Sequence, residues 1–510
     1  MPASPSTARA INDRLALRLL QQEGPLTAGQ LKQLTGLSRP TVADLVERLS
    51  VSGLIAVVGE AGEQRRGPNA KLYGIVADRA YLAALDVRTE GVSVIVSDLL
   101  GRVLAEASVP IGDDTGTGPA VEQAVALVER AAKEAGAMGA PPREDVRAWG
   151  RLHTVGIGAP GLIDPATGEL RDSSGLPAWH RRLVAVLQER LPDARVTVEN
   201  ETNLAALAEQ REGAARDRDT FVLLWLGQGT GAAVVLDGAL RRGASGGTGE
   251  IGFLPVPGTG GLPSATDCAG GFHSLAAAGA IVGLAGEYGV GADDGGGLGA
   301  AELVRGATDR VAGSVGGAAG GVAGSVGGAT GGVAGSVGGA TGGVAGSVGG
   351  ATGGVAGSVG GATGGVAGSV GGATGGVAGS VGGATDRVAG SVRGAAGGVA
   401  ESVRGAADSA ESGESAARFL DALADRLAIG VASVAAVLDP GCVVLGGEIG
   451  QAGGEVLAGL VEERVRRMSP LVTEVRASVL GGGAVLRGAL LTAQDRAQDE
   501  LFAPPGPWGR

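Results

Sequence analysis

The 510-residue sequence predicts an α/β protein with a small helical module at its N-terminus and a glycine-rich insertion near its middle. Three observations predict this class. Two helix patterns flank a glycine turn before residue 52, strand–glycine–helix units follow residue 80, and an 11-residue unit then recurs. We expect a helical module at residues 1–78 and an α/β body in two parts, at residues 79–298 and 411–500. An insertion at residues 299–410 separates the two parts of the body, and residues 501–510 form a short tail.

Charge and cysteine content narrow the class of protein. The net charge is −12, yet residues 1–77 hold nine basic and six acidic residues, a local excess of three positive charges (9 − 6). This asymmetry favours a module that faces an anionic partner and is carried on an acidic body. The two cysteines, Cys268 and Cys442, exclude a disulfide framework and suit a reducing compartment. Because no apolar run resembles a signal peptide or a membrane span, we expect a cytoplasmic protein without membrane association.

The N-terminal module contains the local signals of a helix-turn-helix. Thr27 can cap a short helix, and Gly36 follows that helix where a tight turn needs a positive φ. Ser38 can cap the next helix, and Pro40 falls in its first turn, where a missing N–H costs nothing. We expect this helix to bury Val42, Leu45, Val46 and Leu49, and a preceding helix over residues 8–22 to place Ile11, Leu15, Leu19 and Leu20 on one face.

Residues 54–75 read as two strands around a loop that carries Gly and Arg, which is typical of a wing. A winged helix-turn-helix places its second helix in the major groove of DNA. We expect DNA contacts at the start of that helix and in the wing, namely Ser38, Arg39, Thr41, Arg65 and Arg66. The alternative is a three-helix module that binds another protein.

Beyond residue 80 the sequence alternates strands and helices. YLAALDVR and VSVIVSDLLGRVL read as paired strands, and HTVGIGAPGLID and FVLLWLGQGTGAAVVLDGAL each combine a strand with a glycine turn. CVVLGGEIG reads as a buried strand that ends in Gly446 and Gly447. Such units are typical of an α/β fold that binds ligands at the ends of its strands.

The insertion is built on an 11-residue unit that recurs nine times from Val311 to Ser409, with VAGSVGGATGG as its clean form. On a helical wheel the valines share one stripe and the glycines lie opposite. Five glycines per unit cost a helix about 5 kcal/mol relative to alanine. We therefore expect a flexible or marginally helical segment rather than a stable amphipathic helix, although the second alternative stays open.

Five motifs occur in order along the body: GIGAPGLIDPATGEL, LPAWHRRLVAVLQERL, VTVENETNLAALAE, GQGTGAAVVLDGALRRGASGGTGEIGF and DPGCVVLGGEIG. Together they resemble the ROK family (repressors, open reading frames and sugar kinases), and the resemblance covers nearly the whole chain outside the repeats. It implies a two-lobed, ribonuclease-H-like body of the actin-like ATPase type. The preceding winged helix is similar to that of the family's transcriptional-regulator branch, which implies a homodimer or higher homo-oligomer on a palindromic operator in double-stranded DNA.

Several positions depart from the pattern of the family's kinases. Their first phosphate loop reads Asp-x-Gly-Gly-Thr, but the aligned residues 86–90 read DVRTE, without the glycine pair and with an added carboxylate. The second loop, residues 227–231, is kept. At the position of the catalytic Asp stands Glu201, whose carboxylate lies about 1 Å further out, and displacements of this size can cost about 100-fold in rate. We expect Glu201 to be a helix-start carboxylate favoured by the helix dipole, next to a cap at Asn200, or a ligand contact, and not a catalytic base.

The positions that bind sugar and zinc in the family's kinases are also altered. Gly175 replaces an Asn, Phe253 replaces a zinc-binding His, Ala276 replaces a sugar-binding Glu, and only Cys268 and His273 remain of the zinc cluster, where tetrahedral zinc takes four ligands. We expect no bound metal and no cofactor. The ligand-binding residues that the resemblance implies are Gly161, Asn200, Glu201 and Glu250.

We therefore expect a catalytically inactive, DNA-binding transcriptional regulator of the repressor type, whose kinase-like body serves dimerisation and senses a sugar or sugar derivative. One alternative is an ATP-dependent sugar kinase that carries a DNA-binding domain. Another is a regulator whose altered pocket senses no sugar.

Overall fold

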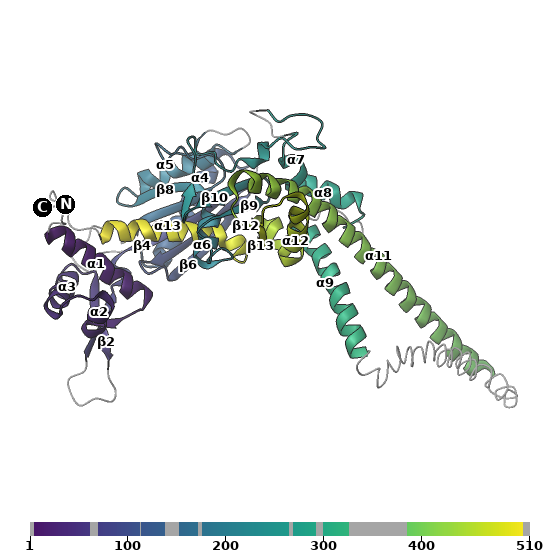
Figure 1. The fold of residues 1–510 in the computed structure, drawn as a ribbon, viewed down its shortest axis with the longest axis horizontal. Helices are drawn as coiled ribbons and strands as arrows, with labels where there is room; N and C mark the ends of the chain where they lie inside the picture. Colours follow the sequence, from purple (N-terminus) through teal and green to yellow (C-terminus); the bar gives the residue numbers. More distant parts are fainter. Residues whose placement is uncertain are drawn as a thin grey trace.

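The computed structural model describes residues 5–61, 70–112, 114–137, 152–171, 176–264, 269–291, 299–325 and 385–502. The N-terminal module lies at one end of the molecule, a two-lobed α/β body forms the middle, and two long helices project from the opposite end (Figure 1). Within the described ranges, no helix is long and apolar enough to cross a membrane.

The module contains three helices and a three-stranded sheet of order β1-β3-β2, and these elements are α1 Pro5–Gln22, β1 Leu26–Thr27, α2 Ala28–Thr35, α3 Arg39–Val51, β2 Ile55–Ala61 and β3 Ala70–Ile75. Helix α3 buries the four predicted residues, from Val42 to Leu49. The expected face of α1 is wrong in part, since Ile11 and Leu15 are 58% and 39% exposed. Helix α1 packs through the predicted Leu20 and through Ala16 and Leu17, which were not predicted.

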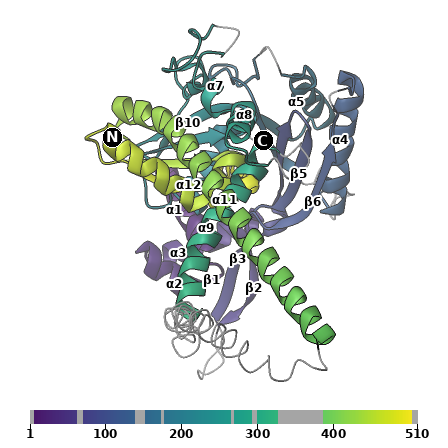
Figure 2. The same cartoon turned by 90° about the vertical axis from the view of Figure 1, so that its right-hand side faces the viewer.

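The N-terminal lobe is built on a sheet of order β6-β5-β4-β7-β8, formed by β4 Tyr81–Arg88, β5 Gly91–Asp98, β6 Val103–Pro110, β7 Leu152–Ala159 and β8 Arg195–Asn200. Strands β4, β7 and β8 run parallel, and β4, β5 and β6 pair antiparallel. Helices α4 Thr117–Glu134 and α5 Trp179–Arg190 cover one face (Figure 2). The parallel strands bring the segments that follow β4, β7 and β8 to one edge of the sheet.

The C-terminal lobe has a second sheet, of order β11-β10-β9-β12-β13, formed by β9 Phe221–Leu226, β10 Thr230–Leu236, β11 Ala239–Arg241, β12 Cys442–Gly446 and β13 Glu474–Ala477. Phe221, Leu223 and Trp225 of β9 point to the core shared with the N-terminal lobe. The alternate residues Val222, Leu224 and Leu226 point to an outer core. Helices α7 His273–Ala276, α8 Ala278–Glu287, α9 Ala300–Ser325, α11 Thr385–Leu438 and α12 Gly447–Met468 contribute to that outer core.

Two helices connect the parts of the molecule. Helix α6, Glu201–Glu212, and helix α13, Ala484–Leu501, lie between the two sheets and share an apolar core with them. That core continues into the N-terminal module, because it also contains Leu17 of α1 and Phe502, which follows α13. The module is therefore packed against the body rather than tethered by a linker alone.

The flanks of the repeat insertion are helical, in α9 and α11. The first turns of α9 belong to the body, because Leu303, Val304 and Ala307 are buried in its outer core. The predicted boundary at residue 299 falls just before this helix and stays a prediction. From Ala416 onward α11 also packs into that core. Residues 326–384, which hold most of the clean repeats, lie outside the described residues, so the expectation of a flexible or marginally helical segment stays a prediction.

Candidate functional site

The start of α3 forms an exposed, capped helix N-terminus. Gly36 adopts φ 70° in the turn after α2, as predicted. The Ser38 hydroxyl accepts a hydrogen bond from the Thr41 backbone N–H at 3.3 Å, and the two hydroxyl oxygens lie 2.7 Å apart. Ser38 and Arg39 are exposed and Thr41 is half-buried. Three of the five predicted DNA contacts are thus brought together on the first turn of this helix.

A wing follows α3. Strands β2 and β3 pair antiparallel from Ile55 with Ile75 to Ala61 with Ala70, which confirms the predicted hairpin. Arg65 and Arg66 lie in the loop between these strands, outside the described residues. Their expected role in DNA binding stays a prediction.

A second candidate site lies where β7 and β8 end. Asn200 caps α6, because its Oδ1 accepts hydrogen bonds from the backbone N–H groups of Thr202 at 2.9 Å and Asn203 at 3.3 Å. Its Nδ2 donates to the carbonyl oxygen of Gly161 at 3.0 Å. Gly161 has φ 106°, a conformation that favours glycine. The amide of Asn200 therefore joins the Gly-Pro-Gly loop to the start of α6, and two predicted ligand residues are in direct contact.

Glu201 opens α6, as expected, but its electrostatic environment differs from the expectation. Burial raises the pKa of its carboxyl to about 8, and the nearby carboxylate of Asp86 adds to the shift. A helix N-terminus alone would lower the pKa of a carboxyl group. Desolvation and the repulsion from Asp86 therefore favour the protonated form of Glu201. The expected role of Glu201 as a helix-start carboxylate or a ligand contact stays a prediction.

Glu250 lies close to the same loop. It precedes the short helix η2, Ile251–Phe253, and its side chain is exposed. A Cβ placed on Gly247 would lie 3.7 Å both from Cγ of Glu250 and from Cδ2 of Leu162, the residue after Gly161. Glu250 and the Gly161 loop therefore flank one glycine turn, and the four predicted ligand residues lie around the start of α6.

The metal-site residues are only partly described. Within the described ranges, no group of three or more His, Cys, Asp and Glu side chains is arranged to hold a metal ion. Cys268 lies outside those ranges, as does Gly175. Phe253 is 39% exposed. The expectation of a metal-free site stays a prediction.

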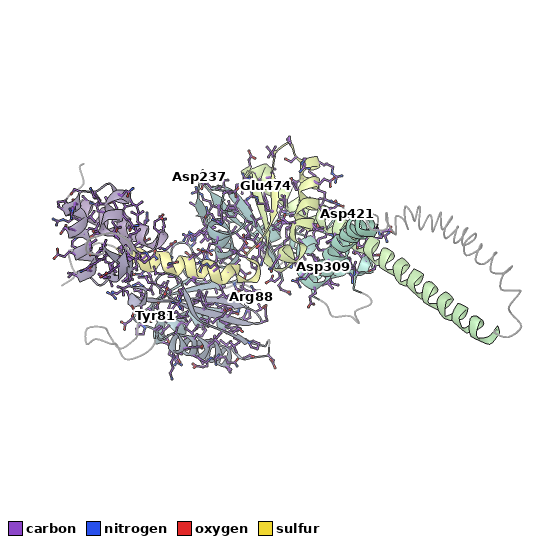
Figure 3. The ribbon with its side chains drawn as sticks, turned by 90° about the horizontal axis from the view of Figure 1, so that it is seen from below. Tyr81, Arg88, Asp237, Asp309, Asp421 and Glu474 are labelled. Atoms are coloured by element: carbon purple, nitrogen blue, oxygen red, sulfur yellow. The ribbon has the colours of Figure 1, made fainter. Side chains whose placement is uncertain are left out.

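A charged cluster at the junction of the lobes escaped the sequence-based site assignment. Arg88, at the end of β4, donates from Nε to Asp86 Oδ2 at 2.9 Å, and its Nη1 donates to Glu448 Oε1 in the first turn of α12. Burial opposes the charge on Arg88, but Asp86 and Glu448 more than offset this and raise its pKa. Figure 3 labels Arg88 near the inner end of α13, and Gly482 and Leu486 line the same hollow as Arg88.

Glu448 also lies over the glycine turn at residues 227–231. A Cβ added to Gly227 would lie 2.6 Å from Glu448 Oε2, so a larger residue there would displace the Glu448 carboxylate. Backbone N–H groups of a glycine turn and of a helix start favour anions. A carboxylate of the chain itself occupies this location. Two features of the sequence mark this cluster: the glycine pair of the kinase loop is absent beside Arg88, and residues 446–448 read Gly-Gly-Glu. Neither feature indicates that Arg88 and Glu448 meet.

Comparison with known proteins agrees with this geometry. The profile of the ROK family matches residues 143–284 and 402–496, and the profile "Winged helix-turn-helix DNA-binding" matches residues 9–56. The chain carries a ROK-family domain and an N-terminal winged helix-turn-helix. The interruption between the two ROK matches contains the repeat insertion.

Curated relatives of this chain include regulators. It is 26% identical over 250 residues to the xylose repressor of Caldicellulosiruptor bescii, an alignment that covers 49% of this chain and 59% of the relative. It is 27% identical over 254 residues to the DNA-binding transcriptional dual regulator NagC of Escherichia coli, with coverage of 49% and 58%. The chain thus spans less than two thirds of the length of either relative.

Among solved structures, a ROK family transcriptional regulator described as a homologue of the E. coli MLC protein matches 97% of this chain and 98% of its own chain. The TM-score is 0.60 at 16% sequence identity. This similarity shows the fold and confirms the predicted architecture, a winged helix-turn-helix joined to a two-lobed body of the actin-like type.

Proposed function

We propose that this protein is a DNA-binding transcriptional regulator of the repressor type. The observation that carries the proposal is the exposed first turn of α3, where Ser38, Arg39 and Thr41 face outward from a helix whose opposite side is buried. A helix presented in this way reads base edges in the major groove with its N-terminal residues. The names of the two curated relatives support this reading.

Ser38, Arg39 and Thr41 would contact the major groove, while Arg65 and Arg66 of the wing would reach phosphates or the minor groove. A homodimer would place two copies of α3 in successive major grooves, so the operator would be a palindrome with half-sites about one helical turn, or a multiple of it, apart. The domain division expected from the sequence, with the insertion at residues 299–410, belongs to the same proposal.

The body would not act as a sugar kinase. In the kinases that the sequence resembles, the first phosphate loop and the glycine turn receive the phosphates of ATP. In this chain Arg88 and Glu448 are ion-paired there, and Glu90 adds another carboxylate to the same hollow. Glu201, at the position of the catalytic Asp, carries its carboxyl about 1 Å further out, and burial and Asp86 raise its pKa, which disfavours the charged form that a base needs. Both features support a body without catalysis.

The site around Asn200 would sense a sugar or sugar derivative. It would offer the second N–H of the Asn200 amide and the carboxyl groups of Glu201 and Glu250, which suit the hydroxyl groups of a sugar, and Gly161 would let the backbone approach the ligand. The relatives are named for xylose and, in other E. coli strains, for N-acetylglucosamine. Binding would close the lobes and change the spacing of the two α3 helices, provided that the ligand distinguishes the two states.

The test is the selection of genomic DNA fragments by the purified full chain at one fixed salt concentration, with and without a panel of sugars. The wild type is compared with the variant Arg39→Ala, which removes one exposed side chain from α3. Enrichment of a palindrome by the wild type and not by Arg39→Ala is expected, and loss of binding with one sugar would identify the effector. Equal, sequence-independent binding by both proteins would overturn the proposal. Sugar-dependent ATP consumption would favour a kinase that carries a DNA-binding domain.

A further inference from the structure

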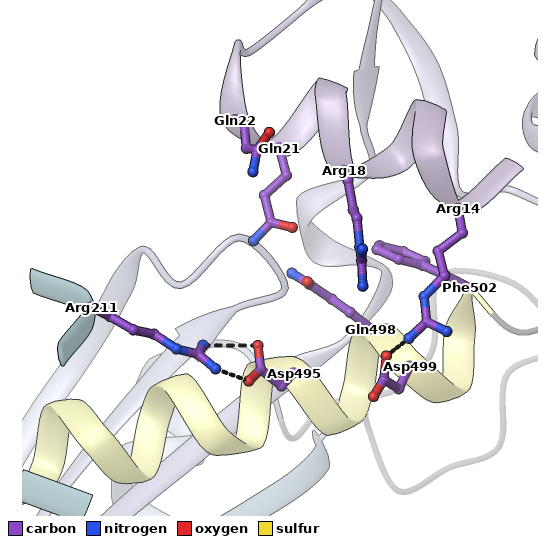
Figure 4. Close-up of a pocket in the computed structure, with 9 residues that line it drawn as sticks. All are labelled: Arg14, Arg18, Gln21, Gln22, Arg211, Asp495, Gln498, Asp499 and Phe502. Carbon is purple, nitrogen blue, oxygen red and sulfur yellow. Dashed lines mark hydrogen bonds and ion pairs between the residues drawn. The ribbon is translucent and has the colours of Figure 1, made fainter. Parts of the chain in front are cut away.

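A cavity of about 430 Å³ lies between helix α1 of the winged module and the outer half of α13 (Figure 4). Its volume falls in the range of small-molecule sites, about 300–1,000 Å³. Its lining contains five charged residues, Arg14, Arg18, Arg211, Asp495 and Asp499. The cavity is separate from the ligand site proposed at Asn200, because Arg211 stands near the end of α6 and Glu201 at its beginning, about 15 Å away along a helix that rises 1.5 Å per residue.

The charges in this cavity do not balance. Asp495 and Asp499 lie one turn apart on α13, and each forms an ion pair with one arginine. Arg211 of α6 donates from Nη1 to Asp495 Oδ1 at 3.0 Å, and Arg14 of α1 is ion-paired with Asp499. Arg18 follows Arg14 by one turn on α1 and makes no ion pair with any residue that the structure describes. Three guanidinium groups therefore meet two carboxylates, and Arg18 is the unmatched cation.

Neutral groups complete the lining. Gln498 donates from Nε2 to the carbonyl oxygen of Leu99 at 3.3 Å, so its own amide oxygen remains available to accept a hydrogen bond. Gln21 and Gln22 contribute two further amides, and Phe502 a largely buried apolar surface. In Figure 4 the Arg18 side chain extends from α1 toward α13, between Gln21 and Arg14. A ligand that matches this set has an oxyanion for Arg18 and hydroxyl groups for the amides.

We propose that this interdomain cavity binds a small phosphorylated or carboxylated polyol and that Arg18 holds its anion. The ligand bridges α1 and α13 and so fixes the winged module on the body. The binding site stands on the geometry of the cavity. Its consequence for DNA affinity rests on the proposed function and is measured separately.

The experiment is a calorimetric titration of the full chain with glycerol 3-phosphate at low, constant ionic strength. Inorganic phosphate, which has the anion alone, and glycerol, which has the hydroxyls alone, are the paired probes. The variant is Arg18→Gln, and the control is Arg9→Gln, which removes one exposed charge from the same helix outside the cavity. Loss of one charge-assisted contact predicts binding weaker by about tenfold or more in Arg18→Gln and unchanged in Arg9→Gln.

Circular dichroism melting without ligand checks that Arg18→Gln is folded, as its exposed position predicts. Equal binding by Arg18→Gln and wild type, or no binding of glycerol 3-phosphate by the wild type, would overturn the proposal. So would loss of binding in Asn200→Ala, which would assign the ligand to the site proposed at Asn200 instead. Equal affinity for phosphate and glycerol 3-phosphate would overturn the part assigned to the hydroxyl groups. DNA binding by ligand-free Arg18→Gln, if retained, excludes a role of Arg18 as a DNA contact.

Discussion

Arg88 at the end of β4 is ion-paired with Glu448 at the start of α12, although 360 residues separate them. The same guanidinium is held by Asp86 at 2.9 Å. Asp86 is 4% exposed, and its other oxygen has no hydrogen-bond partner in the described part of the chain. One arginine thus links the two lobes and offsets carboxylates that would otherwise repel each other.

Replacing Arg88 by Ala should destabilise the protein by about 1–3 kcal/mol, because it leaves buried Asp86 and its neighbours without a cation. Urea unfolding at pH 7 measures the change. Arg130→Ala, on the exposed side of α4, removes an equal charge and should change stability by less than about 0.5 kcal/mol. Equal effects of the two substitutions would contradict a structural role for the link between the lobes.

Replacing Glu201 by Gln should change how stability depends on pH. Between pH 4.5 and about 8 the unfolded chain loses a proton that the folded chain keeps on Glu201. This carboxyl group therefore lowers the free energy of unfolding as pH rises through that window, and its penalty is constant above it and absent below it. The shift sets an upper limit of about 5 kcal/mol.

Unfolding curves of wild type and Glu201→Gln at pH 4.5, 6 and 8.5 provide the measurement. The variant should gain stability over the wild type from pH 4.5 to 8.5, since Gln keeps the size of Glu without its charge. Parallel stability profiles of the two proteins would show that Glu201 has an ordinary pKa.

Asn200 combines two roles that two substitutions can separate. Asn200→Ala removes both the cap of α6 and the hydrogen bond to Gly161, and should cost about 1–2 kcal/mol of stability and abolish the response to a sugar. Asn200→Ser keeps a capping hydroxyl but removes the donor to Gly161. We expect it to restore most of the stability and not the sugar response, measured as sugar-dependent release from operator DNA. Recovery of both by Ser would mean that only the cap matters.

Arg39→Ala should weaken binding to the selected operator by about tenfold or more while changing affinity for random DNA less, as expected for a side chain that reads base edges. Fluorescence anisotropy at two salt concentrations measures both affinities. Arg130→Ala serves as the charge-matched control. An equal loss on operator and random DNA would assign Arg39 to phosphate contact instead.

The winged module was the most predictable part of the fold because its signals are local. The Thr27 and Ser38 caps and the Gly36 turn each depend on backbone within three or four residues, and all were confirmed. The face of α1 was predicted in part wrongly, since Ile11 and Leu15 satisfy the same helical period as the residues that are buried. Periodicity identifies a helix, but only the neighbouring surface selects which stripe is covered.

The candidate site divides in the same way. The position of Asn200 as a cap and of Glu201 in a first helical turn followed from a strand-to-helix pattern in one short segment. The raised pKa of Glu201 could not be predicted, because it arises from burial and from Asp86, which lies on strand β4, far from Glu201 in the sequence.

The local elements, their order and the departures from the kinase motifs are readable from the residues alone, because caps, turns and alternating strands act over a few residues. The packing of the folded chain brings Arg88 to Glu448 and Asp499 to Arg14, and it leaves Arg18 without an ionic partner among the described residues. Ion pairs depend on distances of a few ångströms in space. Such distances are set by the packing of sheets and helices, and no pattern within one segment encodes them.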